Sequence, residues 1–304
     1  MATTRVFVTD SLPDAARQAL SGFEVYEKRA DGEAVSKCQA LVCWPARVKP
    51  DLLRQMAGLR MVQTMSAGVD ALDFRSLPAG VQVFSNAGAF TDAVAEHAWG
   101  LLLGVAKGVH VRNVRTTPRA LRAKTLLVMG AGSIGSEVAR LSKSLGMRTI
   151  GVSRSFRSPE FFDEMHQVAS LSQVVAAADA IVIALPLTRS TRGMVDYPFL
   201  SKAKNEVIVV NVGRGETVDE EGLLRWLTDR PESRYATDVF WKSEGKEVFA
   251  TKAWELPNFA GTLHSSGTPI GGSLVGPKVA AALNVKRFFE TGEAANRVEI
   301  SEYL

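Results

Sequence analysis

The sequence predicts an α/β protein built from two doubly wound domains, each a largely parallel sheet with helices on both faces. The chain of 304 residues is longer than the usual single domain of roughly 100–200 residues. Short apolar runs alternate with helical stretches along its length, which is typical of parallel strands joined by right-handed crossovers. A glycine-rich turn near the middle of the chain opens a second series of this kind.

The first series precedes the glycine-rich turn. Its apolar runs indicate strands at Val6–Thr9, Leu41–Trp44, Met61–Thr64 and Val81–Phe84. Helices are expected at Pro13–Leu20 and Pro50–Met56, both opened by a proline, which suits a first helical turn. A longer helix is expected at Thr91–Lys107, where Thr91 and Asp92 provide a cap and a first-turn acid.

The second series begins at Thr125 and continues to about Thr262. Its expected strands are Thr125–Met129, Thr149–Val152, Ala180–Ala184, Val207–Val210 and Tyr235–Asp238. Its expected helices are Ile134–Leu145, Leu171–Ala177 and Glu220–Thr228, followed by a last helical stretch from about Thr268 to Phe289. We therefore expect residues 1–95 and 270–304 to form one domain and residues 96–269 the other, with a cleft between them.

Composition and charge exclude several classes of protein. Hydrophobic residues make up 46% and charged residues 22%, and the net charge of +4 comes from basic residues interspersed with acidic ones. A nucleic-acid-binding protein usually has a concentrated basic face, so no nucleic-acid partner is expected. No apolar run reaches the ~18 residues of a membrane span, and no signal peptide is visible, so a cytoplasmic location is expected.

The two cysteines, Cys38 and Cys43, flank an apolar run that indicates a buried strand. This placement favours structural thiols over a disulfide. No His, Cys, Asp or Glu cluster has the spacing of metal ligands, so no metal is expected.

The most informative motif is a GxGxxG hexapeptide formed by Gly130, Gly132 and Gly135. It directly follows the apolar strand Thr125–Met129 and opens the helix Ile134–Leu145. In this context the first glycine permits a tight turn, the second lets the backbone approach a pyrophosphate, and the third lets helix and strand pack closely. The helix N-terminus then faces the phosphates. We therefore expect a dinucleotide site at these glycines, with Ser133 and Ile134 included in it.

The end of the next strand bears on which dinucleotide binds. An NAD site usually has an acidic residue there, about 20 residues beyond the glycines, that accepts hydrogen bonds from the ribose 2′-hydroxyl. This chain has Ser153, Arg154 and Ser155 instead. A guanidinium and hydroxyls suit a 2′-phosphate, so NADP(H) is favoured over NAD(H). The alternative is that Arg154 and Arg157 are exposed surface cations.

Several further segments, taken together, resemble the D-isomer-specific 2-hydroxyacid dehydrogenase family. In chain order they are Ser66-Ala67-Gly68-Val69-Asp70, Asn86-Ala87-Gly88, Val94-Ala95-Glu96-His97, Leu185-Pro186-Leu187-Thr188, Thr191-Arg192-Gly193, Asn211-Val212-Gly213-Arg214-Gly215, Asp238-Val239-Phe240 and Leu263-His264-Ser265-Ser266-Gly267. The resemblance covers nearly the whole chain. It implies a flavodoxin-like substrate domain, a Rossmann cofactor domain, and hydride transfer between a nicotinamide and a small 2-keto or 2-hydroxy acid, of the glyoxylate or hydroxypyruvate type.

The chemistry of keto-acid reduction requires a cation, a proton donor and a hydride donor. Arg214 follows a strand and a glycine, so its guanidinium can bind a carboxylate or a carbonyl oxygen. His264 is the natural acid and base, since an imidazole pKa near 6.5 suits proton transfer around neutrality. By resemblance, both residues match catalytic positions. The amides of Ala67 and Gly68 match a loop that holds the substrate carboxylate, and Asp238 matches a residue that contacts the nicotinamide amide.

The third catalytic position is a glutamate that, in the family, follows the Asp-Val-Phe segment. Here strict register falls on Ser243, and Glu244 comes one residue later. We expect a one-residue loop adjustment to place Glu244 beside His264. Otherwise His264 has no carboxylate partner from this loop, or Glu247 serves.

The resemblance extends the cofactor site to Leu185, Pro186, Thr191 and Val212, and it implies a homodimer formed through the cofactor domain. The segment between Lys107 and Thr125, which usually contributes to that contact, is shorter here than in most relatives. Its basic residues favour a solvated connector, with an anion-binding arm as the alternative.

Two other functions remain open. One is a formate dehydrogenase of the same family, an activity associated with Gln beside the histidine; no Gln occurs between Asp238 and His264. The other is a binding module that senses nicotinamide nucleotides, as corepressors among the relatives do.

Overall fold

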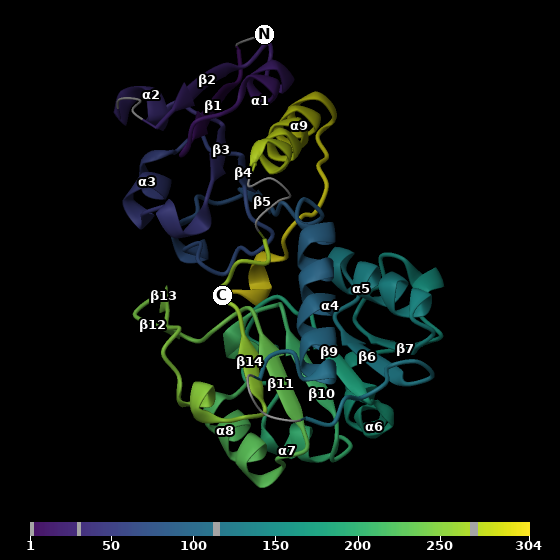
Figure 1. Ribbon diagram of the computed structural model, residues 1–304. Helices are drawn as coiled ribbons and strands as arrows, with labels where there is room; N and C mark the ends of the chain where they lie inside the picture. The colour runs from purple at the N-terminus through teal and green to yellow at the C-terminus, as the bar shows by residue number, and fades with distance from the viewer. Residues whose placement is uncertain (1–2, 29–31, 112–115, 268–272) are drawn as a thin grey trace. The chain divides into compact units, whose positions relative to one another are not determined.

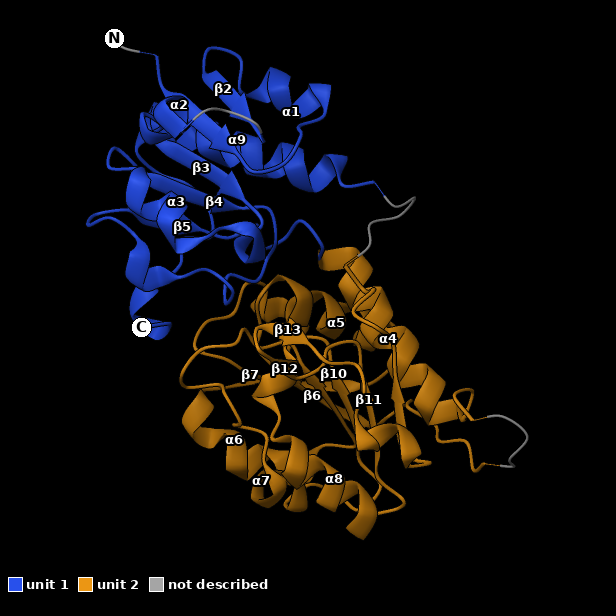
Figure 2. Cartoon of the chain, turned by 90° about the vertical axis from the view of Figure 1, so that its left-hand side faces the viewer, with its two compact units in different colours: residues 1–90, 269–304 blue, residues 91–268 orange. Residues whose placement is uncertain are grey.

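The computed structural model of the protein describes residues 3–28, 32–111, 116–267 and 273–304. The chain divides into two compact units, Met1–Phe90 with Pro269–Leu304, and Thr91–Thr268 (Figure 2). The sequence prediction placed the first boundary at residues 95 and 96. The structure places it at Thr91 because α4 (Thr91–Lys107) is one continuous helix, which a boundary at residue 95 would divide.

The first unit has a five-stranded sheet whose neighbouring strands are all parallel, in the order β2-β1-β3-β4-β5. This is the flavodoxin-like order, in which the chain reverses direction across the sheet between β1 and β3. The strands are β1 (Arg5–Val8), β2 (Glu24–Glu27), β3 (Ala40–Cys43), β4 (Met61–Thr64) and β5 (Gln82–Phe84).

Alternating side chains along these strands enter two buried clusters, one on each face of the sheet. On one face Val6, Val42 and Met61 pack with α1 (Asp14–Ala19) and α9 (Val275–Thr291). On the other face Phe7 and Leu41 pack with α2 (Gly32–Ser36) and α3 (Pro50–Gln55). The last long helix therefore completes the core of the first unit.

The second unit has a seven-stranded parallel sheet in the order β14-β11-β10-β9-β6-β7-β8 (Figure 1). The direction across this sheet reverses between β6 and β9, which makes the carboxyl ends of these two strands its topological switch point. The strands are β6 (Thr125–Met129), β7 (Arg148–Val152), β8 (Glu164–His166), β9 (Ala180–Ile183), β10 (Ile208–Asn211), β11 (Arg234–Thr237) and β14 (Phe259–Gly261).

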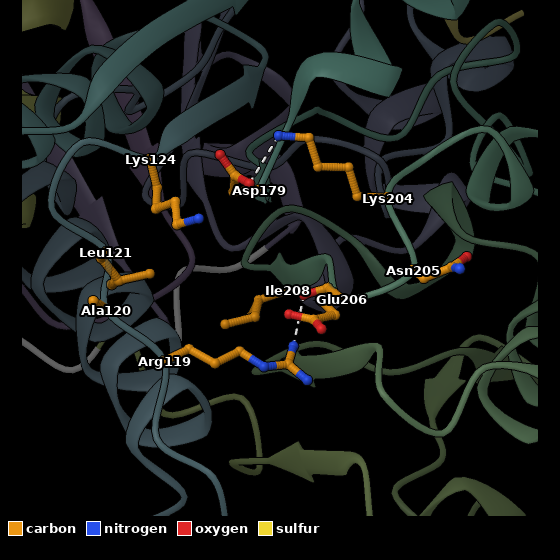
Figure 3. A pocket seen from close by; sticks show the side chains of 9 residues that line it. All are labelled: Arg119, Ala120, Leu121, Lys124, Asp179, Lys204, Asn205, Glu206 and Ile208. Atoms are coloured by element: carbon orange, nitrogen blue, oxygen red, sulfur yellow. Dashed lines mark hydrogen bonds and ion pairs between the residues drawn. The ribbon is translucent and has the colours of Figure 1, made fainter.

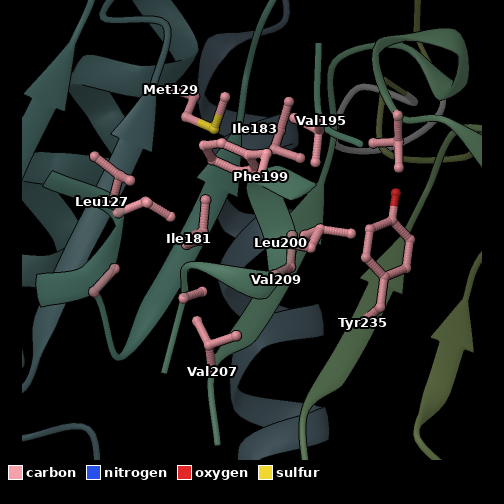
Figure 4. Close-up of a cluster of buried hydrophobic side chains, with 14 of the residues drawn as sticks. Leu127, Met129, Ile181, Ile183, Val195, Phe199, Leu200, Val207, Val209 and Tyr235 are labelled. Carbon is pink, nitrogen blue, oxygen red and sulfur yellow. The ribbon is translucent and has the colours of Figure 1, made fainter. Parts of the chain in front are cut away.

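Helices cover both faces of the larger sheet. α4 contacts α5 (Ser133–Ser144) as well as β10 and β11, and the Trp99 indole donates to the Val138 carbonyl between the two helices. The opposite face, shown in Figure 4, buries Ile181, Val209 and Tyr235 beneath three further helices. These are α6 (Leu171–Val174), α7 (Tyr197–Ser201) and α8 (Glu220–Asp229).

The remaining elements are short. A two-stranded antiparallel hairpin consists of β12 (Lys242–Ser243) and β13 (Lys246–Glu247). Short 3₁₀ turns lie at η1 (Pro45–Arg47), η2 (Phe74–Ser76), η3 (Pro159–Phe161), η4 (Val168–Ser170), η5 (Val175–Ala177), η6 (Gly215–Thr217), η7 (Lys252–Glu255) and η9 (Ile300–Glu302). In the described part of the chain, no helix is long and apolar enough to cross a membrane.

Both cysteines are free and fully buried around β3, which confirms that they are structural thiols. Burial raises the pKa of Cys38 to about 11 and that of Cys43 to about 12. Both thiols are therefore protonated near neutral pH and unreactive as nucleophiles.

The glycine turn between β6 and α5 provides a test of this fold. A Cβ at Gly135 would lie 1.8 Å from the Gly130 carbonyl oxygen, so alanine cannot be accommodated without moving the helix from the strand. We expect Gly135→Ala to lower the free energy of unfolding by about 1–3 kcal/mol, the usual cost of overpacking, as measured by urea denaturation.

The matched control is Gly132→Ala, where an added Cβ meets nothing within 4 Å. It should cost no more than about 1 kcal/mol, since alanine is only a poorer N-cap than glycine. Equal losses in the two variants would contradict the close helix–strand contact.

Candidate functional site

The glycine turn presents unpaired amides at the carboxyl edge of the larger sheet. Gly130 adopts φ +95° and its amide donates to the Val152 carbonyl, which ties the turn to β7. Gly132 precedes α5, and a Cβ added there would face open space. Among the described residues, the amides of Ser133 and Ile134 have no acceptor. Such a helix N-terminus suits an anion because its free N–H groups and dipole both favour negative charge.

Beside this turn lies a cavity of about 410 Å³. It is lined by Met129, Gly130, Gly132, Val152, Ser153, Arg154, Ser155, Val168, Leu171, Ala184, Leu185, Pro186, Thr188, Ser190, Thr191 and Met194. Most of these residues lie at or after the carboxyl ends of β6, β7 and β9, while Val168 and Leu171 follow β8, so the cavity lies at the switch point of the sheet. One part of its wall is apolar, from Val168 and Leu171, and another is polar and basic, from the segment that begins at Ser153.

Most of the sequence-predicted cofactor residues meet in this cavity: Gly130, Gly132, Ser153, Arg154, Ser155, Leu185, Pro186 and Thr191. Ser133, Ile134, Gly135, Val212 and Asp238 do not line it. Gly135 and Val212 are buried. Gly135 packs against Gly130, and Val212 donates its amide to the Ile183 carbonyl at the end of β9. The sequence analysis missed the apolar wall of Val168 and Leu171. In sequence, apolar residues that line a cavity cannot be distinguished from those of an amphipathic segment that packs in a core.

The segment after β7 folds back over the glycine turn. The Arg157 amide donates to the Ala131 carbonyl at 3.0 Å, and its guanidinium donates to the Ser133 hydroxyl at 3.0 Å. This holds the exposed Arg154, three residues earlier, at the cavity wall. Two cationic side chains therefore belong to the segment that borders the unpaired amides of α5.

A second cavity, of about 380 Å³, lies at the opposite edge of the sheet, where β6, β9 and β10 begin (Figure 3). Two of its three cations are engaged by its own walls. Lys204 is paired with Asp179 at 2.8 Å, and the Arg119 guanidinium donates to the Glu206 carbonyl at 2.6 Å. Arg119 is thus a structural tie rather than part of a solvated connector. Residues 112–115 of that predicted connector lie outside the described residues.

Arg214 follows β10 in a loop whose backbone is fixed by hydrogen bonds and close packing. Its carbonyl oxygen accepts hydrogen bonds from Asn211 Nδ2 at 2.9 Å and from Thr217 Oγ1 at 2.7 Å. Both donors are fully buried, so the loop is fixed from inside the protein. Gly215 makes this possible, because a Cβ there would lie 2.2 Å from the Phe240 backbone. The Arg214 backbone is thereby fixed at the carboxyl edge of the sheet, and its half-buried guanidinium donates to the Gly213 carbonyl at 2.8 Å.

His264 is paired with Glu247, not with Glu244. Its Nδ1 lies 2.6 Å from Glu247 Oε2, while the other carboxylate oxygen accepts the Phe240 amide at 2.5 Å. The Glu247 side chain is 15% exposed and that of His264 is 44% exposed. The Phe240 amide therefore fixes the Glu247 carboxylate, and the His264 imidazole keeps Nε2 for a second hydrogen bond.

The expectation that Glu244 lies beside His264 is wrong, and hairpin geometry explains why. Glu244 and Gly245 have φ of +50° and +76°, so they form the two-residue turn that joins β12 to β13. The Glu244 side chain lies exposed at the tip of this turn, and Ser243 is exposed beside it. Glu247 returns along β13 opposite Lys242 and faces the histidine.

Asp238 organises the loop that carries His264. Its carboxylate is fully buried; Oδ1 accepts the Thr262 hydroxyl at 2.6 Å and the Ser265 amide at 2.9 Å, and Oδ2 accepts the Ser266 amide at 2.9 Å. Its backbone carbonyl accepts the His264 amide at 2.8 Å. One aspartate thus fixes the loop on both sides of the histidine.

The first unit contains the other predicted substrate residues. The loop after β4 is braced by the buried Asn86, whose amide nitrogen donates to the Met65 carbonyl at 3.0 Å, and by Ser66 Oγ, which donates to the Gly68 carbonyl at 2.7 Å. Both of these hydrogen bonds are accepted by backbone carbonyl groups of the loop. The amides of Ala67 and Gly68 have no acceptor within the described residues, so the loop offers two N–H donors to a ligand.

These features fit a dinucleotide. The open space over Gly132 would be filled by any side chain, the unpaired amides at α5 suit a pyrophosphate, and the apolar wall suits a flat ring. In the described ranges, no group of three or more His, Cys, Asp or Glu side chains could hold a metal ion.

Comparison with known proteins agrees with this geometry. The family model described as D-isomer specific 2-hydroxyacid dehydrogenase, NAD binding domain, matches residues 81–266. A glyoxylate reductase of Aeropyrum pernix is 34% identical over 269 residues, which cover 79% of this chain and 80% of that protein. A hydroxypyruvate reductase of Thermotoga maritima is 29% identical over 283 residues, covering 87% and 92%. A solved structure from Pyrobaculum aerophilum, with a provisional formate dehydrogenase name, matches with a TM-score of 0.82 and 29% identity over 99% of this chain and 100% of that one.

The Asp238 contacts can be tested by stability. We expect Asp238→Asn to lower the free energy of unfolding by about 1–3 kcal/mol, because an amide cannot accept hydrogen bonds at both of its heavy atoms and leaves a buried backbone amide unpaired. Urea denaturation measures this loss. The control Asp219→Asn should change little, since Asp219 caps α8 through the Gly222 amide and asparagine caps helices equally well. An unaltered Asp238→Asn protein would refute the structural role.

Proposed function

Because the chain belongs to the D-isomer-specific 2-hydroxyacid dehydrogenase family and is an oxidoreductase of CH–OH donors, we propose that it reduces a small 2-keto acid with NADPH. The observation that carries this proposal is the pair of His264 and Glu247, joined at 2.6 Å. Relatives named glyoxylate reductase and hydroxypyruvate reductase support substrates of that size.

The pair supplies the proton that reduction of a carbonyl group requires. Glu247 accepts the Nδ1 proton of His264, which stabilises a positive imidazolium and leaves the Nε2 proton for the substrate. The hydride for the carbonyl carbon would come from the reduced nicotinamide when the cofactor is bound. Nε2 then gives its proton to the carbonyl oxygen, so the products are the 2-hydroxy acid, NADP⁺ and a neutral imidazole with its proton on Nδ1.

The substrate needs a counter-charge as well as a proton. We assign this role to Arg214, whose planar guanidinium can hold a carboxylate or a carbonyl oxygen with two parallel hydrogen bonds. We assign the unpaired amides of Ala67 and Gly68 to the substrate carboxylate, as the family resemblance implies. Asp238 is kept as a proposed contact of the nicotinamide amide, although most of its acceptor capacity serves the His264 loop.

Preference for NADPH rests on the cavity wall. Ser153, Arg154 and Ser155 line it where an NAD site usually presents an acidic residue. The segment 153–157 contains no carboxylate that would repel a 2′-phosphate, and its two arginines carry the opposite charge. We include Arg157 because its guanidinium lies against Ser133 at the phosphate-binding end of α5.

Formate oxidation is the less favoured alternative. It transfers a hydride and releases carbon dioxide, so no proton has to be moved. A histidine held by a carboxylate, rather than by an amide, is suited to proton transfer, which this reaction does not use. A nucleotide sensor without turnover is the other alternative. A homodimer through the cofactor domain remains part of the proposal.

The cofactor assignment predicts a selective loss. Arg154→Asp should weaken NADPH binding about 10- to 100-fold, the equivalent of one or two hydrogen bonds to a charged group, and leave NADH binding within about 3-fold. Fluorescence titration of both cofactors measures this. Arg225→Asp makes the same charge change on α8, outside the cavity, and should affect neither. Equal effects of Arg154→Asp on the two cofactors would remove Arg154 from the 2′-phosphate site.

The proton-donor assignment predicts a graded loss of turnover. In assays at 340 nm with NADPH and a panel of 2-keto acids, His264→Ala should lower kcat by roughly 10²–10⁴, the range for general acid–base catalysis. Glu247→Gln should lower it about 10- to 100-fold, because the charged hydrogen bond is lost. The exposed Glu244→Gln is the matched control and should retain full activity. Tight NADPH binding without turnover of any keto acid would favour the sensor instead.

A further inference from the structure

His97 lies on α4, on the side that faces the loop carrying His264. Its Nε2 is 2.7 Å from Thr262 Oγ1 and 3.5 Å from Asp238 Oδ1. The side chain is 23% exposed, and the Asp238 side chain is completely buried. His97 thus brings a basic side chain within 4 Å of a carboxylate that is shielded from water.

Proton accounting fixes the direction of these hydrogen bonds. The ionised Asp238 carboxylate can only accept hydrogen bonds. The Thr262 hydroxyl, whose oxygen lies 2.6 Å from Oδ1, therefore donates its single proton to Oδ1. Thr262 Oγ1 can therefore only accept from the imidazole. Nε2 of His97 must carry a proton, and the chain of donors runs from His97 through Thr262 to Asp238.

The far end of this chain is the backbone around His264. Asp238 receives the amides of Ser265 and Ser266 through its side chain and that of His264 through its carbonyl. His264 itself adopts φ +51°, a left-handed conformation that is costly for a residue with a side chain. Such a conformation persists only where the surrounding contacts hold it, and here these contacts converge on Asp238.

We infer that His97 is a positioning residue for the reaction: its Nε2–H completes the contacts of Asp238 and thereby holds His264 in the orientation from which it delivers a proton. The inference rests on the proposed role of His264 as proton donor. His97 does not need to touch substrate or cofactor. The part it supplies is a hydrogen-bond donor, not a charge, so a neutral donor in the same place should replace it.

Glutamine provides that replacement, because its terminal amide nitrogen reaches about as far as imidazole Nε2, whereas leucine fills a similar volume with no donor. We expect His97→Leu to lower kcat about 10- to 100-fold, as loss of a hydrogen bond that supports a charged group would. KM for the keto acid should change less than 3-fold. His97→Gln should retain kcat within about 3-fold, and urea denaturation should show both variants folded.

A second measurement does not depend on turnover. In NMR spectra of the histidine-labelled protein without cofactor, the imidazole signals of His264 should shift in His97→Leu and in Thr262→Val, and should return in His97→Gln. The double variant should shift them no further than either single variant, because both act through one chain.

The outcomes separate the inference from the proposed function. Unmoved His264 signals and normal kcat in His97→Leu, or a His97→Gln protein as impaired as His97→Leu, would overturn the positioning role. Shifted signals together with unchanged turnover would support the positioning role and overturn instead the assignment of His264 as proton donor.

Discussion

A buried carboxylate at the end of β11 is the constraint on which the candidate site depends. Asp238 is completely shielded from water, so every hydrogen bond that its oxygens lack would carry the full penalty of desolvation. The loop from Thr262 to Ser266 satisfies it with a hydroxyl and two amides. The same interactions fix the backbone of His264. The need of the buried Asp238 carboxylate for hydrogen-bond donors therefore also determines where the imidazole lies.

The parallel sheet explains why residues so distant in sequence can cooperate. Because all seven strands run in one direction, the segments that follow them emerge at a single edge (Figure 1). The segments at that edge begin with Gly130 after β6, Ser153 after β7, Ala184 after β9, Val212 after β10, Asp238 after β11 and Thr262 after β14. At the opposite edge, Lys204 and Arg119 are engaged by the walls of the second cavity, whereas the candidate cofactor residues gather at the carboxyl edge.

The sequence was sufficient to predict strands whose apolar residues reflect burial on both faces of the sheet. β3, β6 and β9 are apolar throughout or nearly so, and their prediction was correct to within one residue. It failed at three of the four edge strands: β2 is half-exposed and bounded by Glu24 and Glu27, β8 consists of Glu164, Met165 and His166, and β14 is only three residues long. An edge strand needs less apolar surface, so its composition resembles that of a loop. The Arg214 and His264 loops were located through motifs, whereas the partner of His264 depended on a turn that spacing alone does not reveal.

The hairpin of β12 and β13 has a consequence for how such enzymes diverge. Its turn is a self-contained dipeptide outside the main sheet, so the loop can gain or lose residues while the buried core stays intact. Side chains alternate between the two faces of a strand, and a single insertion would therefore exchange the residue facing the imidazole for its neighbour. Position-by-position alignment across this loop would then equate residues that occupy different places. In homologues of this chain, the acidic partner of the histidine is better identified by which hairpin face it occupies than by its distance from Asp238.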